Sequence, residues 1–264
     1  MGRFTTIFFF LMAGIIPGAQ AQIFPAPQKG FEKRIHDAVY AVRLLDSHEH
    51  LMPEKEALQA AADFSVLFTN YQVSDLVSAG GLTEDKLYRV FKAKDIPLEQ
   101  KWDVIKMNWP EMRTTAYGRS ILIAARDLYE VNDLNENTYK ELSSRIAQMH
   151  KPGYYEKILK DKSKIDACLI MEYNTVNPRD VETEGNCNFR RFFVYDKYVT
   201  FRCFNKMVTK LSVYGKKFQT LAGYEALIDS VFLQDVAKGI QGAKFGVAYS
   251  RTLKLEDVSR EAAN

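Results

Sequence analysis

The stretch Arg43-Leu44-Leu45-Asp46-Ser47-His48-Glu49-His50-Leu51 decides how the rest of the sequence is interpreted. It ends a short apolar run, predicted as a strand over residues 43–47, and holds two of the four histidines in the chain. Successive side chains of a β-strand point to opposite faces, so His48 and His50 share one face with Asp46 and Leu44. Two neutral imidazoles at one strand end form the first half of a divalent-metal site. The pair is equally compatible with two surface histidines in a polar loop.

Three later apolar runs predict strands, at residues 165–171, 191–195 and 243–249. The segments between strands carry helix-forming residues and helical periodicity, at 31–42, 54–68, 115–129, 137–149, 206–214 and 224–237 among others. Thr83, followed by acidic residues, is predicted to cap one more helix. Strands separated by helical connections indicate an α/β chain with a parallel sheet. A long helical section of about 52–160 separates the first two strands.

The two faces of the predicted fourth strand differ. Phe245, Val247 and Tyr249 form a bulky face suited to packing on helices, and Lys244 lies on the opposite face among small residues. In a (β/α)8 barrel this second face points inward, where a lysine is a candidate for function. A lysine that extends to solvent from the strand start fits the same pattern.

The first 21 residues have the features of a secretory signal peptide: a basic start, an apolar core and a small-residue ending at Ala19 and Ala21. The mature protein, 22–264, is therefore expected to be secreted or periplasmic. The apolar run is shorter than a membrane-spanning helix requires, so no stable span is expected after cleavage.

Composition is that of an ordinary globular protein, with a formal net charge of +3 and no block of basic residues. Nothing in it predicts a nucleic-acid partner or a particular oligomeric state. The three cysteines are too few for a disulfide framework in a chain of this length. Proximity in sequence favours Cys187 with Cys203 if one bridge forms.

The segment Asp46-Ser47-His48-Glu49-His50-Leu51, at the end of the first strand of an α/β chain, resembles the metal-dependent amidohydrolase superfamily. The stretches 115–129 and 243–249 resemble its amidohydrolase-related branch of TIM-barrel hydrolases, with uronate isomerases as structural relatives. The resemblance covers nearly all of residues 22–264. It implies a metal-dependent enzyme that acts on a small-molecule substrate.

In that family the two histidines after strand one bind a divalent metal at the mouth of the barrel, which implies His48 and His50 as ligands. A lysine on strand four, often a ligand once carbamylated, matches Lys244 by position. The family's further ligands, histidines after strands five and six and an aspartate after strand eight, have no counterpart here. Zinc is the expected ion for imidazole ligands in a hydrolytic site, and manganese or iron suit similar ligands.

The number of predicted strands also indicates that part of the barrel is missing. A complete barrel has eight strand–helix units in about 250 residues. Only four strands are predicted here, so the fold class is an incomplete (β/α)8 barrel with a helical insertion after strand one. The sequence is therefore expected to be the N-terminal part of a longer hydrolase, poorly stable or inactive alone.

Two functions follow from these residues. The first is an exported metal-dependent hydrolase of amides, esters or lactones, or a uronate-isomerase-like enzyme, with Lys244 as ligand or substrate-orienting residue. Trp102, Trp109 and Tyr117 of the insertion would then cover the mouth, or form the core of a helical cap. Glu49 is not expected to act as the base, because strand alternation points it away from the histidines. The second function is a non-catalytic exported binding domain that keeps the fold without a full metal site.

Overall fold

The computed structural model describes residues 29–69, 71–80, 82–172, 188–199 and 218–263. The predicted signal peptide, the predicted helix at 206–214 and the predicted Cys187–Cys203 bridge lie outside these residues. The chain divides into two compact units, Met1–Val42 and Arg43–Asn264. The first contains the exposed helix α1 (Gly30–Ala41), and all other described elements belong to the second. Within the described residues, no helix is long and apolar enough to cross a membrane.

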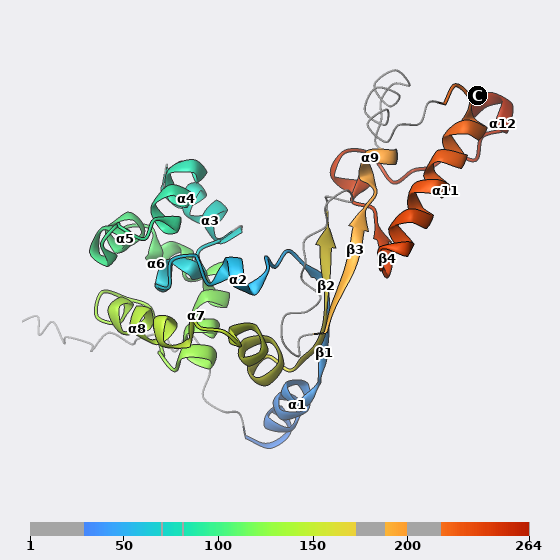
Figure 1. The fold of residues 1–264 in the computed structure, drawn as a ribbon. Coiled ribbons are helices and arrows are strands. Elements are labelled where there is room, and N and C mark those ends of the chain that lie inside the picture. The colour runs from blue at the N-terminus through green and yellow to red at the C-terminus, as the bar shows by residue number, and fades with distance from the viewer. Residues whose placement is uncertain (1–28, 70, 81, 173–187, 200–217, 264) are drawn as a thin grey trace, which may run out of the picture. The chain divides into compact units, whose positions relative to one another are not determined.

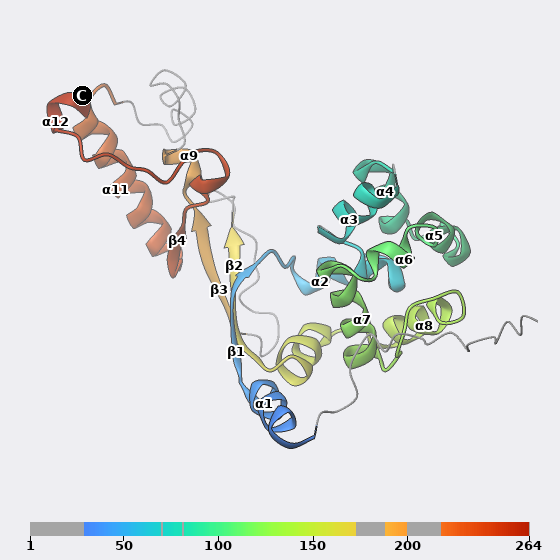
Figure 2. The same ribbon diagram turned by 180° about the vertical axis from the view of Figure 1, so that it is seen from behind.

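Four parallel strands form one sheet in the order in which they occur in the sequence. They are β1 (Leu44–Glu49), β2 (Ile165–Glu172), β3 (Phe189–Val194) and β4 (Gly242–Lys244), and Figures 1 and 2 show them from opposite sides. Parallel neighbours require long crossover connections, and the described helices between β1 and β2 and between β3 and β4 belong to two of them. The predicted α/β class with a sequential parallel sheet, as in the first half of a (β/α)8 barrel, is confirmed.

Strand β1 is irregular where the candidate site begins. Asp46 lies opposite Cys168 and Glu49 opposite Ile170, so the step from Asp46 to Glu49 on β1 spans one residue more than the matching step on β2. This β-bulge shifts the alternation of side chains along the strand. The strand also continues beyond the predicted end at residue 47, through His48 to Glu49.

Strand β4 is shorter than predicted, and the expected bulky face at 245–249 is wrong. The strand ends at Lys244, and Val247–Tyr249 (η4) forms a 3₁₀ turn in which Tyr249 is 87% exposed. Asp196 ends the ladder, because its Oδ1 accepts the Gly246 amide proton at 2.5 Å. A Cβ atom at Gly246 would approach Asp196 Oδ2 to 2.9 Å, so this close approach favours glycine.

Helices fill the chain between β1 and β2. They are α2 (Glu54–Ala57), η1 (Phe64–Leu67), α3 (Tyr71–Gly80), α4 (Glu84–Lys92), α5 (Leu98–Ile105), α6 (Trp109–Met112), α7 (Ala116–Tyr129), α8 (Tyr139–Met149) and the π-helical η2 (Glu156–Lys162). The predicted Thr83 cap is confirmed, since its side chain accepts the Lys86 amide proton, and Thr115 caps α7 in the same way. The single helix predicted at 54–68 is wrong. It breaks after α2, where Asp63 takes an extended conformation and caps η1 through the Ser65 amide.

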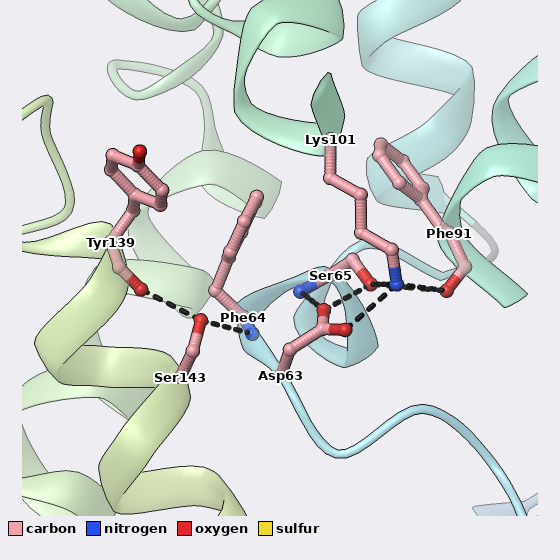
Figure 3. A network of polar contacts seen from close by, with 7 residues as sticks. All are labelled: Asp63, Phe64, Ser65, Phe91, Lys101, Tyr139 and Ser143. Carbon is pink, nitrogen blue, oxygen red and sulfur yellow. Dashed lines mark hydrogen bonds and ion pairs between the residues drawn. The ribbon is translucent and has the colours of Figure 1, made fainter. Parts of the chain in front are cut away.

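A buried ion pair joins η1 to α5 inside the helical section (Figure 3). Lys101 is fully buried, and its ammonium lies 2.7 Å from Asp63 Oδ2 and 3.4 Å from both Ser65 Oγ and the Phe91 carbonyl oxygen. Ser143 of α8 extends this network of polar contacts by accepting the Phe64 amide proton at 3.2 Å. Buried charges are tolerated only when paired and hydrogen-bonded, and these contacts meet that condition.

The tryptophans of the insertion belong to its core. Trp102 is 4% and Trp109 3% exposed; Trp102 stacks on Tyr139, and the Trp109 indole donates to the Leu134 carbonyl at 2.7 Å. Tyr117 is at the surface, where its ring stacks on Tyr71. These aromatics were expected either to cover the mouth of the barrel or to form the core of a helical cap. The two tryptophans lie in the core.

The C-terminal part packs helix α11 (Leu221–Ala237) beside β3. The shared core holds Phe193, Tyr195, Tyr198, Phe218, Leu227, Val231 and Ile240. Tyr195 also donates its hydroxyl proton to Asp235 of α11 at 2.8 Å, which satisfies a buried carboxylate. Two short helices, α9 (Asp196–Val199) and α12 (Arg260–Ala263), complete the described elements.

Candidate metal centre

The imidazole rings of His48 and His50 face each other at the carboxyl end of β1. Their Nε2 atoms lie 3.1 Å apart and their ring centroids 5.0 Å apart, and both side chains are exposed to solvent. Two nitrogen ligands of one tetrahedral zinc ion lie about 3.3 Å apart, given Zn–N bonds of about 2.0–2.1 Å. The donor type and the spacing of this pair therefore fit two ligands of a single divalent ion.

Lys244, the last residue of β4, reaches the other side of the His48 ring. Its Nζ atom lies 3.1 Å from His48 Nδ1. Strands β1 and β4 are the two edges of the sheet, separated by three strand spacings of about 4.8 Å each. The contact shows that Lys244 and His48 share one face of the sheet and extend toward each other across it.

The contact with Lys244 also constrains where the proton of a neutral His48 resides. An ammonium group only donates hydrogen bonds, so Nδ1 of His48 must accept, and the ring then carries its proton on Nε2. In this tautomer His48 donates to His50, which gives a hydrogen-bond chain from Lys244 through His48 to His50. Binding a metal ion through both Nε2 atoms requires the other tautomer of His48, and Lys244 must then turn away from Nδ1.

Glu49 lies beside Asp46, and among the described contacts its carboxylate meets the backbone amide of His50 and neither imidazole ring. The bulge between these residues brings the two carboxyl groups into hydrogen-bond contact. Burial raises the pKa of Glu49 to about 7, and the hydrogen bond and charge of Asp46 add to this effect. The His50 amide donates to Glu49 Oε2 at 3.3 Å and opposes the shift, while the His48 amide donates to Asp46 Oδ1 at 3.2 Å.

The remaining histidines take no part in this centre. His36 belongs to α1, where its ring stacks on Tyr40. His150 follows α8, and its two ring nitrogens are buried without a hydrogen-bond partner. Across the ranges that the structure describes, no group of three or more His, Cys, Asp or Glu side chains is arranged to hold a metal. The described chain thus supplies two imidazole donors and one neighbouring ammonium.

Asp196 is a residue at the carboxyl end of the sheet that sequence reasoning did not single out. It begins α9 two residues after the end of β3, and its carboxylate accepts the Gly246 amide proton just after β4. The carboxyl ends of parallel strands are where ligands bind in α/β sheets, so its position after an apolar run was the available signal.

Comparison with known proteins supports the fold and adds no close relative. No protein-family model matches the sequence, and no curated protein matches it either. Among solved structures, uronate isomerase from Thermotoga maritima superposes with a TM-score of 0.59 at 15% sequence identity. The match covers 81% of this chain and 48% of that protein, so the chain spans about half the length of its structural neighbour. At this identity the likeness shows a barrel-type α/β fold alone.

Proposed function

We propose that His48 and His50 bind a divalent metal ion in an exported enzyme of the amidohydrolase type. The observation that carries this is the convergence of their Nε2 atoms at 3.1 Å, at the strand end where barrel enzymes place their sites. Zinc is the first expectation, with manganese or iron as alternatives. The reaction is hydrolysis of an amide, ester or lactone, or a uronate-isomerase-like proton transfer, for which the structural neighbour gives support.

Each residue of the candidate centre would have its own role in this reaction. His48 and His50 hold the ion, which supplies Lewis acidity to polarise a carbonyl group and favour deprotonation of water. Lys244 orients the substrate rather than binding the ion, because it contacts His48 at Nδ1 and not at the nitrogen that faces His50. When it turns away from His48, its ammonium is available to orient an anionic or carbonyl group of the substrate.

Metal analysis tests the proposal. Purified protein is loaded with zinc, dialysed and analysed for bound metal, alongside the double variant His48→Ala/His50→Ala and the control His36→Ala. We expect about one ion per chain, lost in the double variant and kept in the control, whose histidine lies on α1. Activity of the metal-loaded protein is then assayed on uronic acids, esters, lactones and amides.

The second function is a non-catalytic exported binding domain. It is favoured by one observation: the described residues contribute two donors and no third ligand of the usual types. Folded protein that binds no metal near neutral pH would support this function and contradict the first.

A further inference from the structure

A cleft of about 490 Å³ opens in the helical section, outside the candidate metal centre. It lies among the C-terminal ends of α7 and α8 and the π-helical η2. Figure 1 shows α7 close to α8 and to the olive segment that precedes β2, and both contact α7. The volume is in the range of small-molecule sites, about 300–1,000 Å³.

Cations dominate the lining of this cleft. Arg145 comes from α8, Lys151 follows that helix, and Lys157 and Lys162 come from η2, whereas Glu130 is the one acidic lining residue. Arg145 lies 3.5 Å from carboxylate oxygens of Glu130 and Glu141. The three lysines have no carboxylate within 4.0 Å among the residues that the structure describes. Like charges around one cleft repel each other, and an anion bound between them removes that repulsion.

Helix ends do not explain the whole cluster. Cations near a helix C-terminus interact favourably with the helix dipole, which accounts for Arg145 and Lys151. Lys157 lies inside the helical segment 154–162, with its amide bonded to the Gly153 carbonyl oxygen at 3.0 Å, so the dipole at a helix C-terminus does not account for it. A structural role alone therefore leaves this lysine unexplained.

The backbone around the cleft is unusual at two places. Glu130 adopts a left-handed conformation with φ of 60°, a position where helices usually end in glycine. Residues Glu156–Lys162 form a π-helix, a form that is rare and frequent at functional sites. Both deviations border the same cluster of cations.

We propose that this cleft binds a phosphorylated small molecule. Leu128, Tyr129 and Met149 provide an apolar wall for its organic part, since the Tyr129 hydroxyl is taken by Tyr154 at 3.0 Å. The lysines bind its phosphoryl groups, for which ammonium ions serve as point charges. The lining has a net charge of +3, which suits a diphosphate better than a monoester of about −1.5 to −2. A concave site of this size favours a soluble anion over a membrane surface. The proposal is independent of the metal centre.

Titration calorimetry with inorganic pyrophosphate, in metal-free buffer with the full chain, tests the proposal. The variant Lys151→Gln/Lys157→Gln/Lys162→Gln is compared with Lys55→Gln/Lys86→Gln/Lys94→Gln, which removes the same charge from exposed lysines outside the cleft. We expect the first variant to bind at least about tenfold more weakly and the second to bind as the parent does. All six lysines are exposed, and circular dichroism checks that both variants fold.

Several results would overturn the proposal. They are the absence of pyrophosphate binding at millimolar concentration, an equal loss of affinity in both variants, or citrate binding as tightly as pyrophosphate. Binding to phosphatidylserine vesicles without binding to pyrophosphate would assign the cluster to a membrane surface instead.

Discussion

Lys244 and His48 set the chemistry of the candidate centre at the scale of single residues. The sequence marks His48 and His50 as a pair because they are two residues apart. The resemblance to amidohydrolases placed Lys244 in the same site, but only the structure shows its Nζ atom 3.1 Å from Nδ1 of His48. That contact favours the tautomer of His48 that does not offer Nε2 to a metal.

The first prediction concerns this lysine. Changing Lys244→Met removes a cation beside His48 and releases Nδ1, so zinc affinity is expected to stay the same or rise by about two- to tenfold. Competition with a chromophoric chelator measures the affinity, with Lys254→Met as control. A loss of affinity as large as that of His48→Ala would instead make Lys244 a metal ligand.

The second prediction, at the scale of elements, concerns the buried ion pair in Figure 3. Lys101→Met leaves Asp63 largely buried without its cation, and is expected to lower the free energy of unfolding by about 3–5 kcal/mol. Lys101→Met/Asp63→Asn should recover part of that loss, because asparagine keeps the acceptor for the Ser65 amide. Urea denaturation measures these changes. Lys140→Met, which breaks an exposed pair with Glu99, should have little effect, and an equal effect would contradict the argument.

The third prediction concerns the hydroxyl pair that links α7 to the segment before η2. Burial raises the pKa of both Tyr129 and Tyr154 above the usual 10. The folded protein therefore keeps protons that the unfolded chain loses. The contribution of each tyrosine to the free energy of unfolding is fully present below about pH 10. Above that pH the free energy of unfolding falls by up to about 1.4 kcal/mol per pH unit for each tyrosine. Urea denaturation between neutral and alkaline pH should show a shallower decline for Tyr129→Phe/Tyr154→Phe. The exposed Tyr117→Phe variant should decline as the parent does, and identical slopes for all three proteins would contradict the effect of burial on these two pKa values.

At the scale of the whole molecule, the feature that matters for association is that the described sheet is open. A barrel has no edges, whereas β1 and β4 are edge strands within the described sheet. On β1, Leu44 is 49% and Leu45 64% exposed, which leaves apolar surface on a strand that is paired on one side only in the described sheet. Such an edge promotes association with other chains.

The fourth prediction follows from that edge. Leu45→Lys is expected to reduce concentration-dependent self-association without lowering the free energy of unfolding by more than about 0.5 kcal/mol, since the residue is exposed. Sedimentation velocity over a concentration series measures association. Leu255→Lys changes an apolar residue that is also exposed but lies outside the strands. If it reduces association equally, general surface polarity rather than the strand edge is responsible.

The sequence by itself determined those features that depend on neighbouring residues. The caps at Thr83 and Thr115, the helix α7 and the apolar strand β2 follow from local hydrogen bonding and from the period of apolar side chains. The alternation of strands and helices was sufficient to predict a parallel α/β sheet, and residues two apart were sufficient to pair His48 with His50.

Only the tertiary structure decided the features that depend on distant partners. The bulge that turns Glu49 toward Asp46 arises from pairing with β2, and the early end of β4 arises from the bond between Asp196 and Gly246. The lysines of the cleft gather because η2 packs beside α7, which no local pattern specifies. The preference of a segment for helix or strand depends on adjacent residues. The register of paired strands, and which side chains meet in one site, depend on contacts between segments far apart in the chain.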